Sequence, residues 1–344
     1  MEVKPKKRML AKLFVATVSE FCERHYKIKK EVKNPMKITI VGAGAMGSLF
    51  GGLLAESGNE VCLLDIWKEH VETINEKGLW IEGLSGDRFI KIKAVTEPIE
   101  IGGISDLLII FVKSYNTENA AKSIFSLVGE NTTILTLQNG LGNFEILSDI
   151  FGQKKVIAGT TSYGATILGP GRVRHAGIGP TVIGELNGQT IARTEKFAQI
   201  LTQAGIKTDT SDNVLGLVWS KLLVNVGINA LGVLLKVKNG ELIKGKHSLK
   251  FQRELVEEAL EIAEKKGIKL IHQDMVKEVA SICEKTSANI NSMLQDVLKK
   301  RKTEIDFING AIVREGEKLN ISTPVNQVIT GLIKAIEEAY KKQI

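Results

Sequence analysis

The chain has 344 residues, of which 43% are apolar and 25% are charged, so it is long enough for two domains with a large core. The three widely spaced cysteines exclude a disulfide scaffold and favour a reduced, cytoplasmic setting, and neither they nor the five histidines have metal-ligand spacing, so we expect no metal centre. The formal net charge of +7 is concentrated in residues 1–35, which carry +6, so it does not indicate a nucleic-acid-binding fold.

Residues 1–35 form a basic N-terminal extension, in which apolar residues recur at helical spacing between Met9 and Phe21. This stretch is too short and too charged to cross a bilayer, and we expect no membrane span. One interpretation is a helix that docks on a membrane surface or on a partner. The other is an extension that activity does not need, or an upstream start codon read in place of Met36.

From Met36 onward, strand-like and helix-like segments alternate, which is typical of a doubly wound parallel sheet. Apolar runs and helical composition predict strands at 37–41, 60–64, 106–112, 133–137 and 156–160, and helices at 45–57 and 67–77. The glycine-rich stretch 161–188 predicts antiparallel hairpins on one edge of the sheet. We therefore expect a Rossmann-type α/β dinucleotide-binding domain over residues 36–211.

The polar residues 209–213 predict a turn that caps the next helix, and beyond them the strand-like pattern stops. The remainder predicts an all-α C-terminal domain over residues 212–344. Its helices are expected at 214–235, 247–266, 273–300, 304–318 and 325–341.

The first predicted strand leads directly into a G-x-G-x-x-G motif, Gly42-Ala43-Gly44-Ala45-Met46-Gly47. A strand before the motif and a helix after it are the context in which it binds a dinucleotide. Gly42 permits a tight turn, Gly44 lets the backbone approach a pyrophosphate, and Gly47 lets helix and strand pack closely. The N-terminus of the helix then offers free N–H groups to the phosphates.

Asp65 ends the second predicted strand, 18 residues after Gly47. A carboxylate at this point accepts hydrogen bonds from the adenosine ribose and repels a 2′-phosphate, so it favours NADH over NADPH. Two alternatives remain open: Lys68, one turn further on, contacts a phosphate, or Asp65 only caps the helix predicted over 67–77.

Two polar residues, Lys113 and Asn139, follow the strands predicted at 106–112 and 133–137. The carboxyl ends of parallel strands are where open α/β sheets bind ligands, so both residues are candidates to face a cofactor or a substrate. The alternative is ordinary loop polarity for Lys113 and a turn for Asn139-Gly140.

Lys221, Asn225 and Asn229 lie at i, i+4 and i+8 on one face of a predicted helix that is otherwise largely apolar. Polar groups on a buried helix are costly unless they meet partners or a ligand. A partly buried lysine also has a readily shifted pKa and can donate a proton. This pattern predicts a site more strongly than it predicts a solvated face.

A second polar cluster contains Asn289 and Ser292, which share a helix face at i, i+3, and Glu304. Glu304 follows Ser292 by twelve residues, and an unbroken helix would point it away from the other two. The sequence therefore predicts a break near 299–302, with Thr303 capping the next helix and Asp306 as its capping-box partner.

Together these features resemble the ketopantoate reductase (2-dehydropantoate 2-reductase) family. The resemblance runs from Met36 to near the C-terminus and is carried by KITIVGAGAMGSL, FVKSYNT, LQNGLGN, WSKLLVNVGINAL, KNGEL and NINSMLQDVLKKRKTEIDFINGAIV. It implies a site in the cleft between the two domains. It also implies reduction of 2-dehydropantoate to (R)-pantoate with NADPH or NADH, a step of pantothenate and coenzyme A biosynthesis.

The resemblance also implies a role for each candidate residue. Lys221 would be the general acid that protonates the ketone oxygen, and Glu304 would orient it. The substrate would be held by Asn225, Asn229, Asn239, Asn289 and Ser292. Lys113 and Asn139 would lie at the cofactor end. Family members that use NADPH commonly carry a basic residue just after the second strand, where this chain has Asp65-Ile66.

Three other functions remain open. The chain could be a related 2-keto acid or hydroxy acid reductase with another side-chain pocket. It could instead bind the nicotinamide cofactor as a sensor without turnover, in which case Lys221 and Glu304 would be dispensable. A third function would reside in the basic extension. For the reductase, we expect a small-molecule keto acid as the binding partner and not nucleic acid. A homodimer is also compatible with this prediction.

Overall fold

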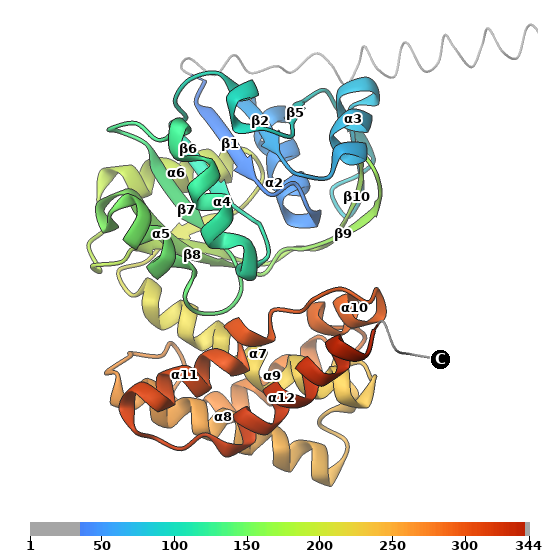
Figure 1. Ribbon diagram of the computed structural model, residues 1–344, viewed down its shortest axis with the longest axis vertical. Coiled ribbons are helices and arrows are strands. Elements are labelled where there is room, and N and C mark those ends of the chain that lie inside the picture. Colours follow the sequence, from blue (N-terminus) through green and yellow to red (C-terminus); the bar gives the residue numbers. More distant parts are fainter. Residues whose placement is uncertain (1–34, 341–344) are drawn as a thin grey trace, which may run out of the picture.

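The computed structural model describes residues 35–340 and divides into two parts stacked on one another (Figure 1). An α/β part runs from β1 (Lys37–Val41) to β12 (Thr208–Thr210), and an all-helical part runs from α7 (Val214–Leu235) to α12 (Pro324–Ala339). This arrangement confirms the predicted fold class. The basic extension lies outside the described residues apart from Pro35.

A sheet of eight strands forms the centre of the α/β part, in the order β12-β11-β8-β7-β6-β1-β2-β5. Every neighbouring pair is parallel except β11 with β8. The strands are β1 (Lys37–Val41), β2 (Glu60–Leu64), β5 (Lys93–Val95), β6 (Leu107–Ile110), β7 (Thr133–Thr136), β8 (Val156–Thr161), β11 (Thr181–Glu185) and β12 (Thr208–Thr210).

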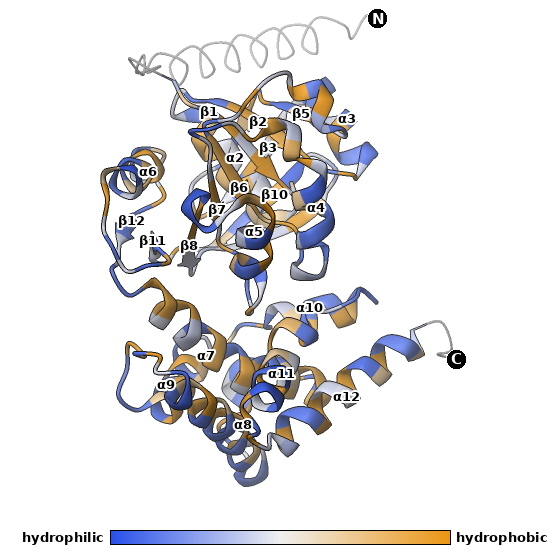
Figure 2. Ribbon diagram, turned by 60° about the vertical axis from the view of Figure 1, so that its left-hand side comes forward, coloured by the Kyte–Doolittle hydropathy of each residue, from blue (hydrophilic) through white to orange (hydrophobic). Residues whose placement is uncertain are grey.

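Helices cover both faces of this sheet, which explains why its central strands are continuous apolar runs. Alternate residues of β6 enter two different cores: Leu107 and Ile109 pack with α2, α3 and α6, whereas Leu108 and Ile110 pack with α4 and α5. Figure 2 shows the apolar colour on the central strands and much of the polar colour on the covering helices. The helices are α2 (Ala45–Glu56), α3 (Lys68–Lys77), α4 (Thr117–Ser123), α5 (Asn143–Phe151) and α6 (Ala192–Gln203).

A second, four-stranded sheet has the order β4-β3-β10-β9. Its strands are β3 (Leu79–Gly83), β4 (Arg88–Ile90), β9 (Gly164–Gly169) and β10 (Arg172–Gly177). The predicted hairpin exists as β9 and β10, but its position on an edge of the main sheet was wrong. The reason is that β10 pairs in parallel with β3, about ninety residues earlier in the chain. The hydrophobic pattern within either strand cannot predict a pairing between segments so far apart. Only β11 joins the main sheet in antiparallel fashion.

The turn predicted over 209–213 is shorter than expected, because β12 continues to Thr210 beside β11. The predicted helix cap is confirmed, since the side chain of Asn213 accepts a 3.3 Å hydrogen bond from Gly216 N. The following helix, α7 (Val214–Leu235), has its predicted bounds.

Helix α7 is the core of the helical part and packs against α8, α9, α10 and α12. It is long and apolar enough to cross a membrane, but 67% of its most apolar window is buried inside the protein, as in a core helix. The other helices are α8 (Lys246–Lys265), α9 (Met275–Lys285), α10 (Ser292–Leu298), α11 (Asn309–Leu319) and α12 (Pro324–Ala339). The single helix predicted over 273–300 was wrong, because a loop separates α9 from α10.

The predicted break near 299–302 is confirmed: α10 ends at Leu298, and Lys300 has a left-handed φ of 50°. The capping box was wrong. The hydroxyl of Thr303 does accept a 3.2 Å hydrogen bond from Ile305 N, but the 3-10 turn Ile305–Phe307 follows, and Asp306 pairs with Lys334 at 3.1 Å. Helix α11 starts only at Asn309, five residues later than predicted.

Candidate active site

The glycine-rich loop joins β1 to α2, and its three glycines have three different surroundings. Gly42 has a φ of +95°, and a Cβ there would lie 2.6 Å from Val112 N. A Cβ on Gly47 would lie 1.9 Å from Gly42 O, so the helix can approach the turn this closely only with glycine. A Cβ on Gly44 would meet nothing within 4 Å. The predicted roles of tight turn, close packing and open approach therefore match the geometry.

The loop fits a dinucleotide pyrophosphate. Ala43 is buried, whereas Gly44, Ala45 and Met46 are half-buried and reach the surface at the N-terminus of α2. The open space in front of Gly44 lets a phosphate reach backbone N–H groups at the positive end of the helix dipole. These residues would hold the pyrophosphate of a nicotinamide dinucleotide.

Asp65 follows β2 and uses both carboxylate oxygens within the protein. Its Oδ2 accepts a 2.6 Å hydrogen bond from Ala43 N, and its Oδ1 accepts a 2.9 Å bond from Trp67 N. The alternative that Asp65 only caps the helix was wrong, because α3 begins at Lys68 with Trp67 as its N-cap and without a side-chain cap hydrogen bond. Asp65 binds the glycine-rich loop instead. Each oxygen keeps a second lone pair that can accept a ribose hydroxyl.

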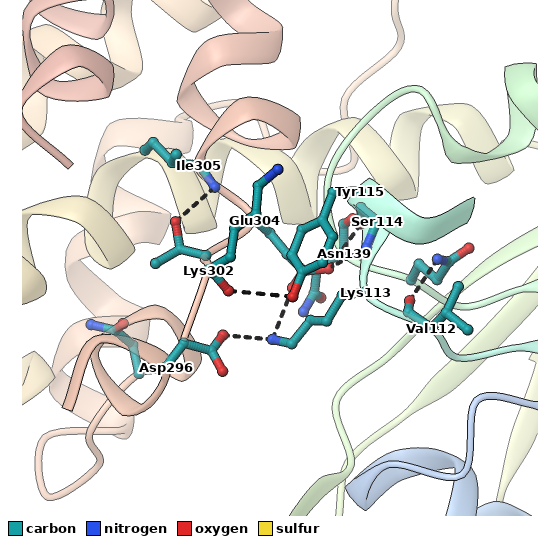
Figure 3. A network of polar contacts seen from close by, with 12 residues as sticks. Val112, Lys113, Ser114, Tyr115, Asn139, Asp296, Lys302, Glu304 and Ile305 are labelled. Carbon is teal, nitrogen blue, oxygen red and sulfur yellow. Dashed lines mark hydrogen bonds and ion pairs between the residues drawn. The ribbon is translucent and has the colours of Figure 1, made fainter. Parts of the chain in front are cut away.

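A cluster of charges joins the two parts of the molecule at the carboxyl end of β6 (Figure 3). The Nζ of Lys113 lies 2.6 Å from Asp296 Oδ2 and 3.4 Å from Glu304 Oε2. Burial works against the ammonium, but the two carboxylates outweigh it and raise the pKa of Lys113. Burial also raises the pKa of Asp296 against the opposite effect of Lys113.

Ser114 completes this cluster from the α/β side. Its backbone N donates a 2.9 Å hydrogen bond to Glu304 Oε1, and its Oγ lies 2.9 Å from the same oxygen. The same hydroxyl lies 2.8 Å from Asn139 O, which also accepts a 3.0 Å bond from Asn143 Nδ2. Asn139 therefore contributes to this network through its backbone, while its side chain stays half-buried at the end of β7.

Lys221 points from α7 to the end of β8, where its Nζ donates a 2.8 Å hydrogen bond to Thr161 O. Burial lowers the pKa of Lys221 to about 8, although the negative charge of Glu304 works in the opposite direction. Glu304 is thus close enough to influence Lys221, but its hydrogen bonds go to Lys113 and Ser114. An amine with this pKa can both hold and release a proton near neutral pH.

Three predicted asparagines present buried polar groups to the helical part of the site. Asn229 is buried on α7, and Asn225 has a buried Nδ2 without a partner among the described residues. Asn239 donates a 3.0 Å bond from Nδ2 to Thr286 Oγ1, and its buried Oδ1 lacks a partner within residues 35–340. Buried polar atoms left in this way fit a polar ligand.

Asn289 and Ser292 are both exposed, and the shared helix face predicted for them was wrong. Asn289 lies in the loop before α10, where its carbonyl accepts a 3.0 Å bond from Asn239 N, and Ser292 is the first residue of α10. Between them, Asn291 caps the helix by accepting a 2.9 Å bond from Leu294 N. The loop thus brings Asn239 and Asn289 together across fifty residues of sequence.

Sequence reasoning missed four polar residues of this region: Ser114, Asn143, Asn291 and Asp296. Asp296 had a usable signal, because it lies at i+4 from Ser292 on α10. Ser114 and Asn143 had none, since a serine after a lysine and an asparagine at a helix start are ordinary. Within residues 35–340, no group of acidic, histidine and cysteine side chains could hold a metal.

A largely parallel sheet with a glycine-rich loop after its first strand, and a buried amine at the same edge of that sheet, are typical of an oxidoreductase that uses a nicotinamide cofactor. The family model for ketopantoate reductase PanE/ApbA matches residues 38–188, and the model for its C-terminal domain matches residues 213–337. The chain belongs to the ketopantoate reductase PanE/ApbA family.

Individual relatives agree with this assignment. The 2-dehydropantoate 2-reductase of Pyrococcus horikoshii is 39% identical over 302 residues, which cover 88% of this chain and 98% of that protein. The one from Archaeoglobus fulgidus is 34% identical over 301 residues, with the same coverage. Among solved structures, the PanE/ApbA family ketopantoate reductase from Ralstonia eutropha is 34% identical with a TM-score of 0.83, covering 89% of this chain and 100% of that one.

A second solved relative carries ligands. A D-mandelate dehydrogenase in ternary complex with NADH and anilino(oxo)acetate is 35% identical, with a TM-score of 0.82, covering 88% of this chain and 99% of that one.

Proposed function

We propose that this chain reduces 2-dehydropantoate to (R)-pantoate with a reduced nicotinamide dinucleotide. The observation that carries the proposal is the Lys221 amine, whose pKa is lowered to about 8 by burial. Its Nζ donates a hydrogen bond to Thr161 O at the end of β8, on the sheet edge that also carries the glycine-rich loop. A proton donor and a cofactor loop at one edge are what reduction of a ketone requires.

When bound, a reduced nicotinamide would supply hydride chemistry at the ketone carbon, and Lys221 would hold the proton that goes to the ketone oxygen. Negative charge develops on that oxygen as the carbon is attacked, and the fixed ammonium neutralises it before it donates the proton. With a pKa near the working pH, a substantial fraction of the amine is protonated, and the protonated amine is still acidic enough to transfer its proton to the ketone oxygen.

The remaining side chains would bind and orient the substrate. The unpartnered Asn225 Nδ2 can donate, and the unpartnered Asn239 Oδ1 can accept, so this pair suits a carboxylate and a hydroxyl. Asn229, Asn289 and Ser292 would extend this polar surface. Glu304 favours the protonated form of Lys221 and would orient it, while Lys113 and Asn139 would lie toward the cofactor.

We further propose that the preferred cofactor is NADH. The carboxylate of Asp65 stands at the end of β2, where the adenosine ribose binds in this type of fold, and its charge would repel a 2′-phosphate. The NADH complex of the related D-mandelate dehydrogenase supports this proposal.

We also propose a cytoplasmic location, a domain boundary at residues 211/212, and a homodimer.

The alternative substrate is another 2-keto acid with a bulkier side chain. The ligand in the related D-mandelate dehydrogenase, anilino(oxo)acetate, favours this candidate. The two candidates share the chemistry of Lys221 and differ only in the pocket around the substrate side chain.

Oxidation of NADH and of NADPH, followed by absorbance with ketopantoate and with phenylglyoxylate in parallel, tests both. Fast turnover of ketopantoate that disappears in Lys221→Ala is the expected result. Faster turnover of phenylglyoxylate would select the alternative. A protein that binds the cofactor but oxidises it with neither acid would overturn both.

A further inference from the structure

A chain of buried hydrogen bonds runs from the turn between β9 and β10 to the glycine-rich loop. Gly171 N donates to His70 Nδ1 at 3.0 Å, and His70 Nε2 lies 3.2 Å from Ser48 Oγ. The hydroxyl of Ser48 donates a 2.7 Å bond to Ala43 O. His70 and Ser48 are both fully buried.

The direction of each bond in this chain is fixed. Because Nδ1 accepts the Gly171 N–H, a neutral imidazole carries its proton on Nε2 and must donate it to Ser48 Oγ. That hydroxyl is then free to donate its own proton to Ala43 O. Burial lowers the pKa of His70. The Asp65 charge and an interaction of the ring with the Ala43 backbone have smaller opposite effects, so the neutral form is favoured.

The consequence reaches the next peptide group. In a planar trans peptide the C=O and the following N–H point in opposite directions. Since Ser48 holds Ala43 O toward the interior, the N–H of Gly44 points to the opposite side of this peptide group. The loop is open at Gly44, where an added Cβ would meet nothing within 4 Å. The preceding peptide group is held separately, because the N–H of Ala43 donates a 2.6 Å hydrogen bond to Asp65 Oδ2.

We propose that His70 and Ser48 are positioning residues for the cofactor, which aim the Gly44 N–H at the dinucleotide pyrophosphate. This inference rests on the dinucleotide binding of the proposed function. We call the hydrogen-bonded series Gly171–His70–Ser48–Ala43 the relay. Trp67 stacks on the His70 ring, with centroids 4.8 Å apart and planes at 9°, and this contact keeps the imidazole in the orientation that the relay needs. The relay thereby ties the second sheet to the cofactor loop.

The decisive variant is Ser48→Ala in the full chain, with the dissociation constants of NADH and NADPH measured by isothermal titration calorimetry. We expect dinucleotide binding to weaken by about three- to tenfold, the effect of one well-oriented hydrogen bond. The matched control is Ser57→Ala, which removes a hydroxyl from the other end of the same helix, where it donates 2.8 Å to Leu54 O. The control should leave both dissociation constants unchanged.

A double-mutant cycle separates a relay from two local contacts. His70→Phe keeps an aromatic ring beside Trp67 but removes both ring nitrogens, and with Ser48→Ala its effect on binding should be far from additive. If His70→Phe does not fold, His70→Gln takes its place in the cycle. Unchanged binding in Ser48→Ala, or additive effects in the cycle, would overturn the relay alone. A wild-type protein that binds neither dinucleotide would overturn the proposed function together with the relay.

Discussion

The glycine-rich loop and the charged cluster around Glu304 are built on different physical principles. The loop is shaped by close contacts within one domain, where a Cβ on Gly42 would lie 2.6 Å from Val112 N and a Cβ on Gly47 would lie 1.9 Å from Gly42 O. The cluster is held by side-chain charges that lie 183 and 191 residues apart in sequence and join two domains. The loop should therefore be sensitive to added volume, and the cluster to removed charge.

The largest effect is expected from the amine of Lys221. Lys221→Ala should lower kcat/KM by roughly 10²–10⁴-fold, because it removes the proposed general acid. Dinucleotide affinity, which depends on the loop, should stay close to that of the wild type. Steady-state kinetics and calorimetric titration of the same preparation make the comparison, and a matching loss of cofactor binding would show that the two regions are not separable.

Two glycines of the loop should respond in opposite ways to the same added methyl group. Gly47→Ala should lower the free energy of unfolding by about 1–3 kcal/mol, because its Cβ meets Gly42 O. Gly44→Ala has open space around it and should leave stability nearly unchanged, yet its methyl group should weaken dinucleotide binding. Urea unfolding and titration of both variants test this, and equal destabilisation would contradict the assignment of Gly44 to ligand approach.

The pH dependence should report Lys221. Its pKa is lowered to about 8, and reduction needs the protonated amine, so kcat/KM for reduction should fall about tenfold per pH unit above that value. Oxidation of pantoate needs the neutral amine and should rise over the same interval. Lys221→Arg cannot lose its proton in this range and serves as the control. Parallel profiles in the two directions would exclude Lys221 as the titrating group.

Asp65 contacts the glycine-rich loop and is the residue proposed to select NADH over NADPH. Asp65→Asn keeps an acceptor oxygen for one of its two backbone bonds but removes the charge that repels a 2′-phosphate. The ratio of kcat/KM for NADPH to that for NADH should rise about tenfold, which corresponds to 1.4 kcal/mol. An unchanged ratio would mean that another residue selects the cofactor.

The smallest effect is expected for the ion pair between the domains. Asp296→Asn leaves Lys113 with Glu304 alone, and because the Lys113 side chain is 36% exposed, the loss of stability should be only about 1 kcal/mol and should shrink as salt is added. Glu118→Gln, in the exposed pair with Lys122, is the matched control and should change nothing measurable. A loss that does not depend on salt would point to packing instead of charge.

Much of the fold could be predicted where the pattern is local. The bounds of α7 and the break after Leu298 followed from hydrophobic periodicity and from the position of Glu304. The second sheet did not, because β3 and β10 become neighbours only when the chain between them has folded. The gap between α9 and α10 was also missed, since the intervening residues carry neither proline nor a run of glycines.

The candidate site divides in the same way. Spacing alone was enough to select some of the candidate residues, because each lies at a fixed interval from a strand or within one helix. They are Gly42, Gly44, Gly47, Asp65 and the three polar residues Lys221, Asn225 and Asn229. The glycine-rich loop, the candidate lysine and the family resemblance were therefore predictable from the order of residues along the chain. Only the tertiary structure placed Ser114 and Asp296 beside Glu304 and Lys113, and linked His70 through Ser48 to Ala43. These contacts depend on side chains meeting across domains or sheets, and the distance between them is set by packing of the whole chain.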